Sequence, residues 1–167
     1  ENFKLLFKIN DSGNNILKLD GDFEISEKDF PINFKLTTQK FGLKPFSAIG
    51  KNVLQDFKGY FDSEVYLSGT FYNPNIKGFI KTNNTSFKVP YLGISYNLKD
   101  NPIFNLDNDK IIINDFIIQD KQLETFGLIN GEISHDRLKD WFLDFSIQSE
   151  NLHAINTTVQ ENQIYYG

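Results

Sequence analysis

The sequence contains no cysteine and no methionine, and its 167 residues include only two alanines and one arginine. The absence of cysteine excludes disulfide bonds, thiol catalysis and cysteine-based metal sites. The scarcity of alanine, together with seventeen phenylalanines and seven tyrosines, favours strands over helices, because aromatic and β-branched side chains suit a pleated surface. No apolar run approaches the roughly 18–20 residues that a membrane-spanning helix requires.

Basic residues are also few and scattered. The net charge is −5, and the 17 basic residues are nearly all single lysines spaced along strand-like segments. A duplex nucleic acid requires a clustered basic face, so we expect no nucleic-acid partner. The length suits one domain over residues 1–167. No signal peptide opens the chain, and its pattern begins and ends without a start or stop signal, which predicts a segment of a longer protein.

The most informative feature that is present is a repeated unit of the form apolar-x-Gly-x-apolar. It occurs at Leu19–Phe23, Phe57–Phe61, Leu67–Phe71, Ile76–Ile80 and Ile129–Ile133. Because side chains alternate along a strand, each unit directs two large apolar residues and the glycine to one face. Glycine inside a strand marks a bend or a close backbone approach. We therefore expect these glycines to give a narrow, curved sheet with room for an apolar guest: Gly21, Gly59, Gly69, Gly78 and Gly131.

Alternating apolar residues predict about ten to twelve strands, joined by short turns rich in Asn, Asp and Gly and paired mostly antiparallel. The clearest are a hairpin around a turn at residues 11–15 and one long strand from Phe57 to Phe71. A turn is expected at 73–75 and another at 134–137.

Two regions depart from this alternation. Residues 39–54 break the pattern, and we expect a short helix or irregular crossover that plugs one end. The runs 111–113 and 116–118 are apolar at every position, which predicts central or covered strands. Residues 76–80 and 87–91 are interpreted as two separate strands. The expected fold is all-β.

Catalytic chemistry finds little support in the sequence. The histidines, His135 and His153, have no suitably spaced carboxylate, and solvated turn histidines are the expected outcome. No Gly-x-Ser-x-Gly motif or nucleophile–base pair is present. The run Asp107-Asn108-Asp109 hints at a calcium loop, but it lacks the turn glycine and the terminal glutamate of an EF-hand, so a plain turn is expected. We expect no enzyme activity, no metal and no cofactor.

The inward apolar side chains allow two interpretations. In a closed sandwich they would pack as ordinary core, whereas recurrent glycine gaps favour an open groove that holds a flexible apolar ligand. The residues expected to line such a groove are Leu17, Leu19, Phe23, Ile25, Phe57, Phe61, Val65, Leu67, Phe71, Ile76, Ile80, Leu143, Phe145 and Ile147. The alternative is a β-sandwich adhesion or carbohydrate-binding module, in which Tyr60, Tyr66 and Tyr72 form a stacking platform. A purely structural repeat with a sealed core is a third interpretation.

Several stretches, taken in order, resemble one known family. The chain is similar to the translocation-and-assembly-module (TamB) family, which is related to the AsmA-like proteins of Gram-negative cell envelopes. The resemblance covers most of the chain and is strongest in 57–98 and 123–167. The matching stretches are Leu67–Thr70, Asn73–Pro74, Ile76–Ile80, Val89–Gly93, Asn130–His135, and Leu152 to Gly167.

This resemblance implies a rolled, open "β-taco", a half-pipe with an apolar groove. It implies a periplasmic location, with an inner-membrane N-terminal helix outside this sequence, and a role in phospholipid transport between the inner and outer membranes. It also implies a link to protein translocation and outer-membrane protein assembly, through an Omp85-type barrel that engages chain beyond Gly167. The expected partners are phospholipid acyl chains and neighbouring β segments of the full-length chain. Unpaired edges near residues 3–9 and 160–167 predict edge-to-edge dimers or chain-to-chain stacking.

Overall fold

The structure, a computed structural model, describes residues 1–10, 16–26, 29–45, 54–137 and 139–157. None of these residues belongs to a helix that could span a membrane. The described strands are β1 (Asn2–Asn10), β2 (Ile16–Glu24), β3 (Ile32–Gly42), β4 (Gln55–Thr70), β5 (Asn73–Val89), β6 (Ile94–Leu98), β7 (Ile103–Asp107), β8 (Lys110–Asp120), β9 (Phe126–Asp136) and β10 (Lys139–Gln148). A short 3-10 turn, η2 (Pro90–Leu92), joins β5 to β6.

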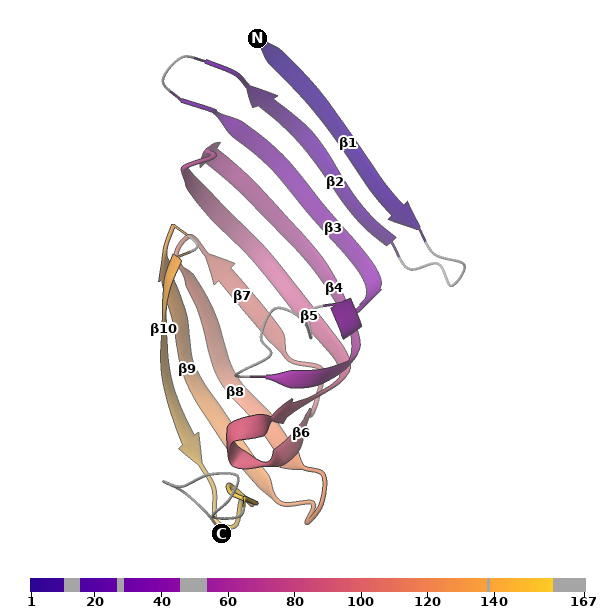
Figure 1. The fold of residues 1–167 in the computed structure, drawn as a ribbon, viewed down its shortest axis with the longest axis vertical. Helices are drawn as coiled ribbons and strands as arrows, with labels where there is room; N and C mark the ends of the chain where they lie inside the picture. Colours follow the sequence, from indigo (N-terminus) through magenta and orange to yellow (C-terminus); the bar gives the residue numbers. More distant parts are fainter. Residues whose placement is uncertain (11–15, 27–28, 46–53, 138, 158–167) are drawn as a thin grey trace.

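All ten strands belong to one antiparallel sheet (Figure 1). Each strand pairs with its neighbour in sequence, except that β6 and β7 lie end to end between β5 and β8. The ten strands therefore occupy nine neighbouring positions, from β1 at one edge to β10 at the other. The predicted all-β, mostly antiparallel class is confirmed, and the described strands form one sheet in place of the two sheets of a β-sandwich.

The cross-strand register assigns every strand residue to a face, because residues directly opposite in an antiparallel pair point to the same side. One row of directly opposed residues crosses all nine positions without interruption. It consists of Phe7, Leu19, Leu36, Val65, Gly78, Leu106, Ile111, Ile133 and Leu143. We call the side that carries this row the apolar face and the opposite side the polar face.

Irregular pairings keep apolar side chains on this face where the sequence changes phase. In β8 the apolar face carries Ile111 and Ile113, and then Phe116 and Ile118, with a register shift between the two pairs. Asp115, inside the shift, has φ of 54°. A β-bulge adds a residue to one strand, and here the extra length reverses which parity points to the apolar face. The two isoleucine-rich runs therefore reflect one strand with a bulge.

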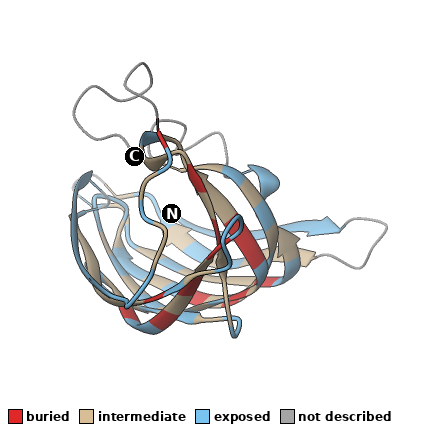
Figure 2. Ribbon diagram, turned by 90° about the horizontal axis from the view of Figure 1, so that it is seen from below, coloured by how far each residue is buried: buried red, intermediate tan, exposed pale blue. Residues whose placement is uncertain are grey.

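The sheet is curved, and the view from below shows its strands following an arc (Figure 2). Bulges increase the local twist of a sheet and bend the strand that carries them. Close approach of neighbouring backbones also requires glycine. At Gly78, with φ of 141°, a Cβ atom would lie 2.0 Å from the carbonyl oxygen of Glu64 on β4. Glycine is therefore required at position 78, where β5 pairs closely with β4.

Several boundaries differ from the sequence-based expectations. The turn expected at 73–75 lies at Phe71–Tyr72, and Pro74 already pairs with Gly69 inside the sheet. Residues 76–80 and 87–91, interpreted as separate strands, fall mainly within one strand, β5, whose register shifts before Ser86. β9 continues to Asp136, past the start of the turn expected at 134–137. The turn at 11–15 and residues 46–53, half of the irregular segment expected at 39–54, lie outside the described residues. The start of that segment is not irregular, because β3 continues to Gly42.

Replacement of Gly78 by alanine tests the close approach. We expect Gly78→Ala to lower the free energy of unfolding by about 2 kcal/mol or more, because the new methyl group meets backbone atoms and the φ value disfavours alanine. Gly42→Ala is the matched control, since nothing lies within 4 Å of its added Cβ. This control should change stability by no more than about 0.5 kcal/mol in urea denaturation. Equal effects of the two substitutions would contradict this account.

Candidate functional site

The apolar face is buried in the middle of the sheet and exposed at its two flanks (Figure 2). Val65 on β4 and Ile113 on β8 are 6% and 5% exposed, whereas Phe7 on β1 and Leu143 on β10 are 48% and 55% exposed. All residues of β1 and of β10 are exposed. The row of apolar side chains therefore ends, on both sides, in large side chains that face solvent.

Most of the predicted lining residues lie on this face. The register places these there: Leu17, Leu19, Phe23, Phe61, Val65, Leu67, Ile76, Ile80, Leu143, Phe145 and Ile147. Phe57 contacts Phe87, with ring centroids 6.3 Å apart, and Phe87 is opposite Tyr96. Ile25 follows the end of β2 and Phe71 lies in the turn after β4, so neither occupies a strand position on the face.

The same face includes residues that the glycine-centred pattern does not select. On β1 they are Phe3, Leu5, Phe7 and Ile9, and on β3 they are Phe34 and Leu36. Their alternation is visible in the sequence, but β1 and β3 lack the pattern around glycine on which the predicted lining relies.

The five glycines lie where an added side chain would meet neighbouring atoms. A Cβ at Gly21 would lie 2.0 Å from the carbonyl oxygen of Asn33 and 2.6 Å from a ring carbon of Phe34. One at Gly131 would lie 2.0 Å from the carbonyl oxygen of Asp144 and 2.9 Å from a ring carbon of Phe145. Neighbouring phenylalanine rings therefore cover these two glycines, an arrangement that stabilises glycine in a sheet. Gly59 and Gly69 have positive φ values, and Gly78 allows close strand contact. At all five glycines an added Cβ would meet a backbone oxygen of a neighbouring residue within 3 Å, so their shared role is backbone geometry.

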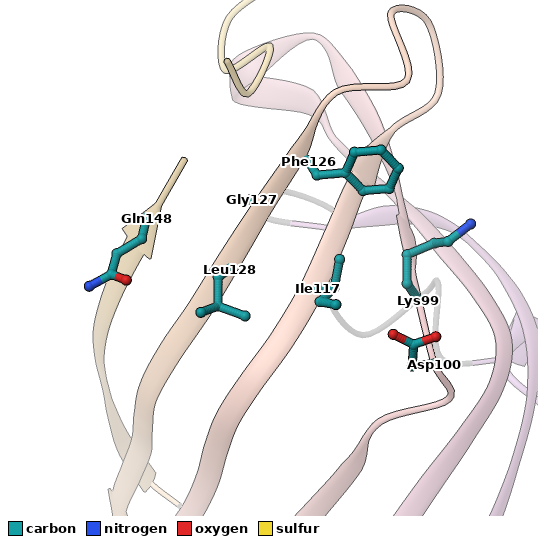
Figure 3. Close-up of a pocket in the computed structure, with 7 residues that line it drawn as sticks. All are labelled: Lys99, Asp100, Ile117, Phe126, Gly127, Leu128 and Gln148. Carbon is teal, nitrogen blue, oxygen red and sulfur yellow. The ribbon is translucent and has the colours of Figure 1, made fainter. Parts of the chain in front are cut away.

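A hollow of about 400 Å³ lies on the polar face, away from the predicted lining residues. Its floor includes Ile117 and Leu128, which are directly opposite each other on β8 and β9. Figure 3 shows these two side chains next to each other, with Gln148 on one side and Lys99 and Asp100 on the other. The hollow is an apolar patch on an otherwise mixed surface.

The polar face is organised by charged and aromatic contacts. The Lys35 ammonium lies 2.9 Å from Glu64 and 5.0 Å from the centre of the Tyr66 ring, and the Tyr66 hydroxyl donates to Glu64 at 2.7 Å. Contacts with Tyr66 and Glu64 raise the pKa of Lys35, while hydrogen bonds from Tyr66 and Lys35 lower the pKa of Glu64. The three tyrosines of the alternative stacking platform, Tyr60, Tyr66 and Tyr72, are all exposed. The Lys35 ammonium, however, lies over the Tyr66 ring, and Tyr72 lies in a turn with its ring against Phe30.

One end of the apolar face is covered by residues 149–157, which we call the C-terminal strap (Figure 1). Leu152 packs against a buried cluster of Ile94, Tyr96 and Ile118. The Tyr96 hydroxyl donates to the His153 carbonyl at 3.0 Å, and burial together with nearby Asp120 raises the pKa of this phenol. The Asn156 amide donates to the Leu92 carbonyl at 2.8 Å. The strap is thus held by apolar packing and by hydrogen bonds.

Asp120 is the buried charged group at this attachment, with 1% exposure. It accepts hydrogen bonds from the backbone amides of Gln122 at 3.1 Å and Leu123 at 2.6 Å, and Nδ1 of His153 lies 3.5 Å away. Burial alone would raise the pKa of Asp120, but these hydrogen bonds and His153 outweigh it, so the pKa is lowered. His153, expected as a solvated histidine, is 19% exposed in this contact. No sequence pattern indicates the pair, because the two residues are far apart and the strap is not periodic.

Among the residues that the structure describes, no three His, Asp or Glu side chains come together in a geometry for a metal ion. Comparisons with models of known protein families, with curated proteins and with solved structures find no significant match to this chain.

Asp120→Asn should weaken the strap attachment. We expect a loss of about 1–3 kcal/mol in the free energy of unfolding at neutral pH, because an amide is a weaker acceptor for the buried amides. The folded-state pKa of Asp120 is lower than that of the unfolded chain, so its contribution is fully present above the unfolded value of about 3.9. This contribution is lost as pH falls through the folded pKa. Urea denaturation should therefore show the difference from the native protein shrinking below about pH 4. A difference that does not depend on pH would contradict this role.

Proposed function

We propose that this protein is a groove-forming segment of an intermembrane phospholipid transport protein, and that its apolar face binds acyl chains. The observation that carries the proposal is the apolar row, which runs across nine neighbouring strand positions and ends in the exposed side chains of Phe7 and Leu143. A sheet in a soluble globular domain normally covers such a face with a second layer. Here both flanks of the face remain exposed to solvent.

The chemistry of the face suits an acyl chain better than a compact ligand. Its exposed members are aliphatic and aromatic side chains, and they are spread along strands β1 and β10. Burial of apolar area contributes about 25 cal/mol per Å², so a long hydrocarbon chain gains several kcal/mol from shallow contacts alone. Shallow contacts also permit release, which a conduit requires.

The curvature of the sheet supports an open β-taco as the form of this groove. We propose that the apolar face is the concave side of this arc, so that its two exposed flanks form the walls of the groove and its buried central residues form the floor. The resemblance to the TamB family adds a biological setting to the proposal. That setting is the periplasm of a Gram-negative envelope, with an inner-membrane anchor and an Omp85-type outer-membrane partner outside this sequence.

Charge substitution on β1 tests acyl-chain binding. Phe7→Lys places an ammonium on the exposed flank of the apolar face, and we expect co-purified phospholipid to fall by about tenfold or more in native mass spectrometry. Leu6→Lys is the matched control. It lies on the same strand, points to the polar face, and is 66% exposed. This control should retain lipid at the native level.

The opposite flank, on β10, offers an equivalent pair of variants. Leu143→Lys changes the apolar face and Phe142→Lys is its control on the polar face; the native side chains are 55% and 64% exposed. Circular dichroism melting should show all four variants folded, because every substituted side chain is exposed. If the two apolar-face variants retain as much lipid as their controls, the proposal is wrong. Absence of lipid from the native protein, even after incubation with phospholipid vesicles, would also refute it.

A further inference from the structure

We infer that the β1 edge of one copy of this protein pairs in parallel with the β10 edge of a second copy, which extends the sheet head to tail. The occupant of each edge is thus another copy of the chain. This inference does not rest on lipid binding, because it concerns the backbone edges and the charges beside them.

The two edges are accessible over their whole length. β1 and β10 are the outermost strands in the sheet order, and every residue of both is exposed. An exposed edge presents unpaired backbone amides and carbonyls, which form a template for another strand. The C-terminal edge expected at 160–167 lies outside the described residues; in the described part of the chain this edge is β10.

The hydrogen-bond phase of β1 follows from its first pair. The amide of Ile25 donates to the carbonyl of Glu1 at 3.0 Å, and the amino group of Glu1 donates to the carbonyl of Ile25 at 3.1 Å. Such pairs recur at every second residue, and the β1–β2 register has no shift. The odd residues of β1 therefore bond to β2. The outward amides and carbonyls belong to residues of the polar face, which are Asn2, Lys4, Leu6, Lys8 and Asn10.

The phase of β10 is the reverse. The amide of His135 donates to the carbonyl of Asp109, so the odd residues of β9 bond to β8 and the even residues of β9 bond to β10. The even residues of β10 are opposite these. The outward groups of β10 therefore belong to residues of the apolar face, which are Leu143, Phe145 and Ile147.

These phases decide how β1 and β10 of two copies can pair. In an antiparallel pair, two hydrogen-bonding residues lie opposite each other on the same face, so β1 and β10 would join the polar face to the apolar face. In a parallel pair, a residue whose amide and carbonyl bond to the partner strand lies beside a residue whose amide and carbonyl point away from it. The polar face of one copy then continues into the polar face of the other, and the apolar face into the apolar face. The sheet has nine strand positions, so β1 and β10 run in the same direction, and both arrows point down in Figure 1. A second copy in the same orientation therefore brings its β1 beside β10 in parallel.

Charges on the polar face favour this arrangement. Lys8 is directly opposite Lys18, whose ammonium is already bound to Asp20 at 2.7 Å. Asp144 is directly opposite Glu132, whose carboxylate is bound to Lys110 at 2.9 Å. Lys8 and Asp144 thus each lie opposite a residue of like charge, and that residue already has its own ion-pair partner.

One register satisfies both edge charges across the junction. When Leu6 lies beside Phe142 of the second copy, Lys8 lies beside Asp144 and Asn10 lies beside Ser146. The Leu6 amide then bonds to the Trp141 carbonyl, and the Leu143 amide bonds to the Leu6 carbonyl. On the apolar face the same register places Phe7 beside Leu143, so the apolar row continues from one copy into the next.

Pairing of β1 with a second β1 is less favourable. An antiparallel pair centred on Leu6 places Lys4 opposite Lys8 of the other copy, twice in each dimer, and like charges directly opposite destabilise a sheet. An antiparallel pair of two β10 strands centred on Asp144 places the two Asp144 side chains directly opposite each other. The head-to-tail pair instead places Lys8 beside Asp144.

Two edge-blocked variants test the inference. Proline at position 6 or 143 removes an outward amide only, so Leu6→Pro blocks the β1 edge and Leu143→Pro blocks the β10 edge while the pairs to β2 and β9 remain. Sedimentation velocity over a wide concentration range should show concentration-dependent oligomers for the native protein. Each variant alone should stay monomeric. An equimolar mixture should form a dimer and nothing larger, because only one compatible pair of edges remains.

Other outcomes overturn the inference. Dimers of Leu143→Pro alone would identify a β1–β1 contact, and dimers of Leu6→Pro alone would identify a β10–β10 contact. A native protein that is monomeric at every concentration, or a mixture of the two variants that does not associate, would exclude head-to-tail pairing. Circular dichroism melts confirm that each variant folds.

A charge exchange provides a test without proline. Lys8→Glu should weaken association of the native protein by about tenfold, and adding Asp144→Lys to the same chain should restore it. Failure of the double variant to recover association contradicts the proposed register. Lipid binding, measured at concentrations where the protein is monomeric, should be the same in both charge variants, so the two proposals can fail separately.

Discussion

The structure depends on one constraint, which is that residues directly opposite in antiparallel strands share a face. A slip of one residue in any pair would send the following apolar side chains to the opposite side. The register avoids this across all nine positions, from Phe7 on β1 to Leu143 on β10. Where the sequence changes phase, as between Ile113 and Phe116, a bulge absorbs the change. The continuity of the apolar face is therefore a property of the register and the bulges together.

The bulges are themselves held by polar side chains of the neighbouring strand. The amide of Lys40, which has φ of 46° at the β3 bulge, donates to Asp62 on β4 at 2.7 Å. The amide of Asp115, at the β8 bulge, donates to the side chain of Asn130 on β9 at 2.7 Å, and Asn130 donates back to Asp115 at 3.1 Å. Asn and Asp tolerate positive φ better than most residues, so part of the abundance of these residues serves backbone geometry.

Features that depend on local alternation of apolar residues can be predicted from the sequence. Features that depend on the neighbouring strand, such as bulges and cross-strand contacts, cannot. The all-β class, the long strand β4 and most of the apolar face follow from period-two patterns. The phase change within β5 is interpreted from sequence as a strand end, because a bulge and a turn look alike until the opposite strand is known. The rings of Phe34 and Phe145 over Gly21 and Gly131, and the contact of Asp120 with His153, join residues from different strands or from the strap. No local pattern specifies such contacts.

The exposed flanks and the open edges are two separate features of the sheet. A strand added to an edge pairs with backbone groups and supplies one further row of side chains, but it does not cover the apolar face. Phe7, 48% exposed, gains a lateral neighbour at such a junction, while the surface above its ring stays open. Removing that surface from water takes a layer that lies over the face, as the C-terminal strap does at the end where Leu152 packs. The proposed head-to-tail pairing would therefore lengthen the apolar face without filling it, and the proposed acyl-chain ligands would have the shape and chemistry to cover what remains.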